Sequence, residues 1–172
     1  MKGKVLLALL AFAGFAQASY VPGTSVYYFP EKDPMTDANT GRLIVAEVND
    51  TQAATVIGVK CLGNGDFDIF LKTKNPLMTA ASYENEAFPK LMYRMDSQAA
   101  KTISTVGVID DKGAPVYNSL AFGDAEDKAL LQAFIKGNKV AIRVLRDGMS
   151  QLDYTFNARG FTAGFKAINN CK

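Results

Sequence analysis

The segment Glu31–Asp37, with the sequence EKDPMTD, holds two aspartates four residues apart. If their side chains lie close together, Asp33 and Asp37 could bind a cation or act as a general acid and a general base. The same letters fit a turn in which Asp and Thr side chains accept hydrogen bonds from nearby backbone amides. We favour the turn and keep both aspartates as candidate binding residues.

A second polar pair follows in the stretch Leu91–Asp96, where Leu91, Tyr93 and Met95 alternate with polar residues. This alternation predicts a strand, and residues i and i+2 of a strand share a face. Arg94 and Asp96 would then either form a solvent-exposed ion pair or recognise a polar ligand together. The ion pair is the simpler interpretation, and both residues remain candidates for binding.

The 172-residue chain contains no His and no Trp. The absence of His excludes His-based triads, His general bases and zinc or haem sites that use His ligands. The stretch Asn64–Asp68 resembles part of a calcium loop, but it lacks the full ligand pattern and the closing Glu, so we predict a hairpin turn there. We therefore expect no catalytic residues, no metal site and no cofactor.

Residues 1–18, MKGKVLLALLAFAGFAQA, show two lysines, an apolar run and an Ala-x-Ala end. This pattern predicts a cleaved secretory signal peptide, because the apolar run is too short to span a membrane. Of the 19 basic residues, Lys2 and Lys4 lie in this segment, so the mature chain would carry 17 basic and 17 acidic residues. That balance argues against a nucleic-acid or membrane-surface partner.

Export also explains the two cysteines. Cys61 and Cys171 are the only pair in the chain, and an exported protein meets an oxidising compartment. We predict one disulfide between them, worth on the order of 4–5 kcal/mol in the loop-entropy description. Two buried free thiols are the alternative.

The mature chain, residues 19–172, shows no linker and is expected to form one domain. Its least periodic part is 19–41. Strands are predicted by β-branched or alternating patterns at 42–48, 54–61, 67–71, 91–95, 103–109, 115–122, 140–144 and 152–156. Turn residues join two clear hairpins, at Gly63–Asp66 and at Asp147-Gly148.

Two helices are predicted. The first covers 125–136, with Asp124 as N-cap and Gly137 as stop, and presents Leu130, Leu131 and Phe134 on one side. The second covers 160–169 and leads to Cys171. The predicted class is α+β, an antiparallel β-sheet with two helices packed on one face and one disulfide.

Several motifs in this order resemble a known family. They are the signal peptide, Asp33-Pro34-Met35-Thr36-Asp37, Val59-Lys60-Cys61, Tyr93-Arg94-Met95-Asp96, and the tail from Gly160-Phe161 to Cys171. The chain resembles the small exported TagO/VasI-like accessory proteins associated with type VI secretion and their relatives. The resemblance implies an exported, non-enzymatic accessory or binding domain with a Cys–Cys bridge.

These observations together favour a binding protein of the bacterial cell envelope, in the periplasm or secreted, whose partner is a protein or an envelope polymer. An exposed cluster among Tyr20, Tyr27 and Tyr28 would favour such a partner. Two alternatives remain. A structural envelope component would use its sheet edges to pair with neighbours, and a carboxylate-based hydrolase would need a deep pocket with perturbed acids.

Overall fold

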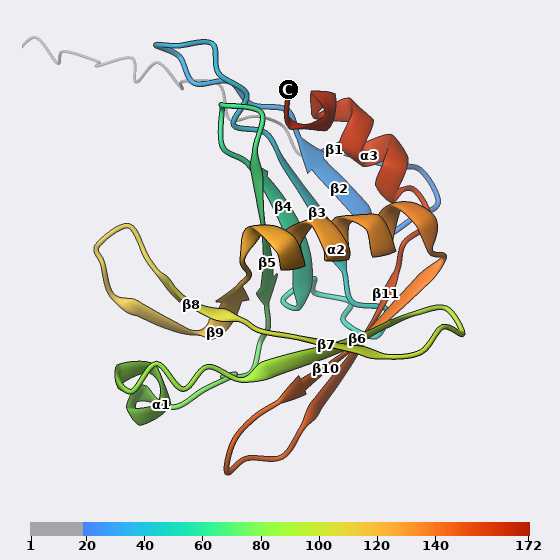
Figure 1. The fold of residues 1–172 in the computed structure, drawn as a ribbon. Coiled ribbons are helices and arrows are strands. Elements are labelled where there is room, and N and C mark those ends of the chain that lie inside the picture. Colours follow the sequence, from blue (N-terminus) through green and yellow to red (C-terminus); the bar gives the residue numbers. More distant parts are fainter. Residues whose placement is uncertain (1–18) are drawn as a thin grey trace, which may run out of the picture.

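The strands of the protein divide between two antiparallel sheets (Figure 1). The structure is a computed structural model and describes residues 19–172. The predicted signal peptide therefore lies outside the described residues. The larger sheet has, in spatial order, β1 (Ser19–Tyr20), β2 (Val26–Phe29), β3 (Arg42–Ala46), β4 (Val56–Cys61), β5 (Phe67–Lys72), β9 (Pro115–Ala121) and β8 (Val106–Ile109). The smaller sheet has β11 (Leu152–Asn157), β10 (Lys139–Leu145), β6 (Lys90–Met95) and β7 (Lys101–Ile103).

Two helices cover one face of the larger sheet (Figure 1). Helix α2 (Asp124–Lys136) packs on β5, and α3 (Phe161–Ala167) packs on β2 and β3. The short helix α1 (Ala80–Glu84) lies beside β9, and a 3-10 turn, η1 (Asn169–Cys171), follows α3. The α+β class, the antiparallel pairing, the two covering helices and the disulfide are as expected. The division into two sheets differs from the single sheet that we expected.

One hydrophobic core joins both sheets to the helices. Phe134 of α2 contacts Phe156 of the smaller sheet and Phe161 of α3, with ring centroids 6.2 and 5.2 Å apart. All three rings are buried. The sheets also meet at Glu47, which bridges to Phe156 and accepts a hydrogen bond from the Thr155 N–H.

Two local expectations need correction, and one further segment contains a strand that was not predicted. The run 103–109 was expected to be one strand, but it divides at Thr105, whose buried hydroxyl donates to the Pro89 carbonyl, and its two halves belong to different sheets. Asp124 is not the N-cap of α2: Gly123 holds that position and Asp124 is already helical. The aperiodic segment 19–41 contains β2, which pairs with β3 along its whole length.

Within residues 19–172, no helix is both long enough and apolar enough to cross a membrane.

Candidate functional site

The smaller sheet has one buried face and one face that no helix of residues 19–172 covers. Leu91, Tyr93, Val140 and Ile142 alternate inward and are at most 6% exposed. Their neighbours in sequence point the other way because side chains alternate along a strand. The outward residues are Lys90, Met92 and Arg94 on β6; Thr102 on β7; Lys139, Ala141, Arg143 and Leu145 on β10; and Asp153, Thr155 and Asn157 on β11. We call this surface the outer face.

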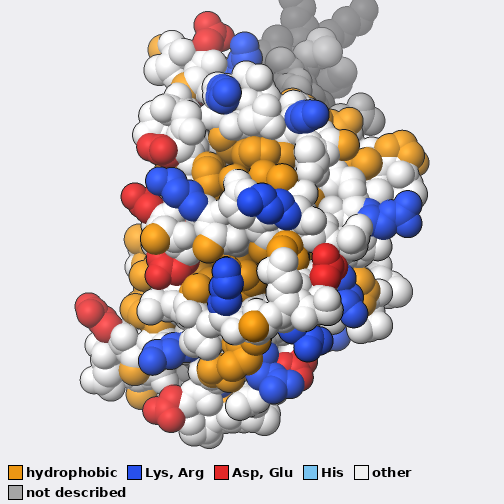
Figure 2. All heavy atoms as spheres, turned by 45° about the vertical axis from the view of Figure 1, so that its right-hand side comes forward, with side chains coloured by type: hydrophobic (Ala, Val, Ile, Leu, Met, Phe, Trp, Pro, Cys, Tyr) orange, Lys and Arg blue, Asp and Glu red, His pale blue; other side chains and the backbone are white. Residues whose placement is uncertain are grey.

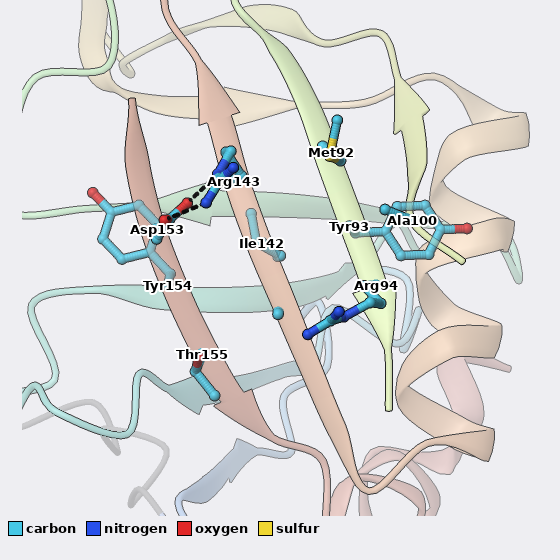
Figure 3. A pocket seen from close by; sticks show the side chains of 10 residues that line it. Met92, Tyr93, Arg94, Ala100, Ile142, Arg143, Asp153, Tyr154 and Thr155 are labelled. Carbon is cyan, nitrogen blue, oxygen red and sulfur yellow. Dashed lines mark hydrogen bonds and ion pairs between the residues drawn. The ribbon is translucent and has the colours of Figure 1, made fainter. Parts of the chain in front are cut away.

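The outer face is hollowed at its centre, where the hollow has a volume of about 350 Å³. Ala141 lies opposite Arg94 on one side and opposite Thr155 on the other. Because Ala has only a methyl side chain, the larger side chains around it form the walls of the hollow. Figure 3 shows Arg94 extending from β6 toward β10, the strand that carries Ala141.

Arg143 and Asp153 form the strongest polar contact of the hollow (Figure 3). They are direct cross-strand partners, and Arg143 donates from Nε to Oδ1 at 2.6 Å and from Nη2 to Oδ2 at 2.8 Å. These hydrogen bonds lower the pKa of Asp153 and raise the pKa of Arg143, so both groups stay charged. The bidentate geometry fixes the orientation of the Arg143 guanidinium, and Nη1 takes no part in this pair of hydrogen bonds.

Arg94 has a different environment. Its side chain is exposed, and its direct neighbours across the strands are Ala141 and, beyond it, Thr155. The ion pairs found within residues 19–172 are Arg42–Glu31 and Arg143–Asp153, so Arg94 has no acidic partner in that range. The guanidinium therefore offers its N–H donors to the hollow.

The expected pairing of Arg94 with Asp96 is wrong. Strand β6 ends at Met95, and Asp96 adopts a left-handed conformation with φ of 49°. This turn redirects the carboxylate toward β10, where it accepts hydrogen bonds from the backbone N–H groups of Asn138 and Lys139. Asp96 thus holds the chain reversal that precedes β10.

The turn interpretation of Asp33 and Asp37 agrees with the structure. Asp33 Oδ1 accepts hydrogen bonds from the Met35 N–H, the Thr36 N–H and the Thr36 hydroxyl, each at 2.9 Å. The bond from Met35, followed by those from Thr36, lowers the pKa of Asp33. Asp37 adopts a left-handed conformation and donates its N–H to the Asp33 carbonyl, which closes the turn.

The three candidate tyrosines, Tyr20, Tyr27 and Tyr28, lie on the larger sheet and do not line the hollow. Tyr20 and Tyr27 are cross-strand partners and are 60% and 36% exposed, whereas Tyr28 points to the other face and is half-buried against the core. Two of the three candidate tyrosines therefore form an exposed pair at the edge of the sheet. On the side of the molecule drawn in Figure 2, basic and acidic side chains are interspersed with hydrophobic ones.

Cys61 and Cys171 are bonded to each other, as predicted, and both are buried. Within the described residues 19–172, no group of three or more His, Cys, Asp or Glu side chains is placed to hold a metal ion.

The carboxyl group with a raised pKa is Asp127, at about 6, mainly because burial disfavours its charge. It lies between α2 and β5 and not in the hollow.

Arg94 was selected from the sequence, but Ala141, Arg143, Asp153 and Thr155 were not. The alternation of Val140, Ile142 and Val144 was a usable signal, because it places Arg143 on the opposite face of the same hairpin. The hollow itself required the register of three strands. Comparison of the chain with protein families, with curated proteins and with solved structures finds no match.

Proposed function

We propose that this chain is an exported, non-enzymatic binding protein of the bacterial cell envelope and that it binds its partner with the outer face of the smaller sheet. The observation that carries the proposal is the uncovered hollow over Ala141, beside an Arg94 guanidinium with no acidic partner in residues 19–172. A concave surface with a few convergent polar groups is the usual form of a binding site.

The non-enzymatic part of the proposal rests on the chemistry of the hollow. Its charged groups are two guanidinium groups and one carboxylate, and the carboxylate is held by Arg143 with a lowered pKa. A general acid needs a pKa near the working pH, whereas the pKa of Asp153 is lowered and so lies further from neutral pH than that of an ordinary aspartate. The resemblance to the TagO/VasI-like accessory proteins leads to the same proposal and adds an association with a secretion system.

The test is binding of the purified mature chain to isolated cell envelopes of its host, measured by co-sedimentation. Ala141→Phe fills the hollow without changing charge and is expected to abolish co-sedimentation. Ala121→Phe, at a half-buried alanine on the larger sheet, is the matched control and should bind like the unchanged protein. Equal binding by the Ala141 variant, with its fold verified by circular dichroism, would show that the outer face is not the binding surface.

A further inference from the structure

The basic residues of the outer face lie in a regular order along the β6–β10 strand pair. In the register of these two strands, Arg94 is the cross-strand partner of Ala141, Met92 is that of Arg143, and Lys90 is that of Leu145. Lys139 precedes Val140, which is level with Met95, and donates its backbone N–H to Asp96. Along the strands the cations therefore follow one another as Lys139, Arg94, Arg143 and Lys90, alternating between β10 and β6.

The register makes this spacing even. Each step in the order is two residues along the strand axis, or about 7 Å at the rise of an extended chain. The four residues span about 20 Å in total. We call this row the cation ladder, and all four of its members are exposed.

The acidic groups beside the ladder are already engaged. Asp153 is held by two hydrogen bonds from Arg143, and Asp96 accepts the backbone N–H groups of Asn138 and Lys139. Glu47, at the far edge of β11, accepts hydrogen bonds from Asn49 and from the Thr155 N–H. The positive charge of Arg94, Lys90 and Lys139 thus faces outward without a carboxylate of the outer face bound to it.

We propose that the cation ladder binds a linear phosphodiester polymer of the polyol-phosphate kind, with phosphates at Lys139, Arg94 and Lys90 and with Arg94 as its central contact, while Arg143 stays paired with Asp153. This inference rests on the proposed binding function of the outer face. An extended repeat of one phosphodiester and a three-carbon unit has about the length of one step, so the phosphates of the chain keep the spacing of Lys139, Arg94 and Lys90. The Arg94 guanidinium binds two phosphate oxygens in a bidentate manner, and the Thr155 hydroxyl lies across Ala141 from it.

The composition of the outer face distinguishes this polymer from two other anionic partners. Single-stranded nucleic acid also has a phosphodiester chain, but its binding surfaces stack bases on exposed aromatic rings. The two tyrosines that line the hollow, Tyr93 and Tyr154, belong to the inward rows of their strands and are only 6% and 8% exposed, and the outward residues named above include no aromatic side chain. Protein interfaces are anchored by large apolar or aromatic residues at their centre, whereas the centre here is Ala141 between guanidinium groups. A chain of phosphates without bases fits both observations.

The experiment is a titration of the mature protein with poly(glycerol phosphate) at several salt concentrations. Binding is measured by calorimetry or by fluorescence anisotropy. We expect binding that weakens steeply with salt, because each contact displaces a counterion. Arg94→Gln should reduce the affinity about tenfold and flatten the salt dependence, while Arg94→Lys keeps part of the affinity. Lys166→Gln, an exposed lysine on α3, is the control and should leave the affinity unchanged.

Two further probes test the identity of the polymer. Polygalacturonate has carboxylates at a different spacing, and oligo(dT) has phosphates with bases, so both should bind more weakly than poly(glycerol phosphate). Equal or tighter binding of either probe, or an Arg94→Gln variant that binds like the unchanged protein, would overturn the phosphodiester assignment. If envelope binding remains sensitive to Ala141→Phe in that case, the proposed binding face stands and only the nature of its ligand is wrong.

Discussion

Asp127 of α2 accepts a hydrogen bond at 3.0 Å from the backbone N–H of Ile69 in β5, a residue 58 positions earlier in the chain. Strand β9 pairs with β5 only from Phe70 onward, so the N–H of Ile69 has no strand partner on that side. The Asp127 carboxylate accepts this N–H in place of a strand and ends the row of backbone hydrogen bonds between β5 and β9. The contact therefore links the covering helix to the edge of a core strand.

This contact predicts a pH dependence of stability. Burial raises the pKa of Asp127 from 3.8 to about 6, and Asp68, Asp124 and Glu126 add to the effect by repulsion. Between these two values the folded protein binds more protons than the unfolded chain, so the free energy of unfolding should fall as the pH rises through that window. The expected loss is about 2 kcal/mol. Urea denaturation at pH 4, 5, 6 and 7 measures it.

Asp127→Asn is the matching variant, because the amide oxygen keeps the acceptor for the Ile69 N–H and removes the charge. The variant should lose most of the decline between pH 4 and 6 and should be at least as stable as the unchanged protein at pH 7. A variant that retains the full decline would assign it to other groups.

Gly58 is required by the ring of Phe70. The two residues are direct cross-strand partners in β4 and β5, and a Cβ on Gly58 would overlap the Phe70 ring. Gly58→Ala should therefore lower the free energy of unfolding by about 1–2 kcal/mol, in spite of the entropy gained by replacing a glycine. The double variant Gly58→Ala/Phe70→Leu should recover part of this loss, as measured by a double-mutant cycle. Additive effects of the two changes would contradict the overlap.

Most of the fold could be predicted from local patterns, and the failures have identifiable causes. The hairpins β4–β5 and β10–β11 combine period-2 alternation with turn residues, and both signals are local. Strand β2 was missed because the aperiodic, proline-rich segment around it hides a strand whose partner, β3, is fixed only by tertiary pairing. The division at Thr105 depends on a hydrogen bond to Pro89, 16 residues away, which no local pattern records.

The site was less predictable than the fold. Arg94 could be selected as an exposed cation on a predicted strand, but its assumed partner, Asp96, turns away in a left-handed conformation. The contact between Arg143 and Asp153 joins two strands of a hairpin, and recognising it requires the register of that hairpin. The cation ladder requires in addition the pairing of β6 with β10, whose facing residues are about 50 positions apart.

The role of Asp96 in its turn can be measured by two substitutions. Asp96→Ala removes the acceptor for the N–H groups of Asn138 and Lys139 and places Ala in a left-handed conformation, so the free energy of unfolding should fall by about 1–2 kcal/mol. Asp96→Asn keeps an oxygen acceptor and tolerates the conformation, and it should cost less than half as much. Chemical denaturation of both variants gives the comparison. Equal losses would mean that the charge of Asp96, and not its hydrogen bonds, is the important property.

The disulfide holds a segment whose backbone is unfavourable. Asn169, Asn170 and Cys171 follow one another with φ of 54°, 51° and 59°, in the left-handed region that asparagine tolerates but cysteine rarely occupies. The Asn39 amide donates to the carbonyls of Ile168 and Lys172, on either side of this segment, and Cys171 bonds to Cys61 at the end of β4. The covalent bond and the Asn39 hydrogen bonds together keep the turn in place.

Replacing both cysteines by alanine should therefore act at two levels. The free energy of unfolding should fall by up to about 4–5 kcal/mol, because the unfolded chain loses a cross-link between residues 110 positions apart. Amides of Asn170–Lys172 should also exchange with deuterium faster than those of β4, because the strained turn opens locally before the sheet does. Glycine in place of alanine at position 171, in the variant that lacks both cysteines, relieves the strain and should slow that exchange again. Uniform exchange across β4 and the C-terminal turn, with no effect of Cys171→Gly relative to Cys171→Ala, would show that the disulfide stabilises the whole fold and does not hold this turn specifically.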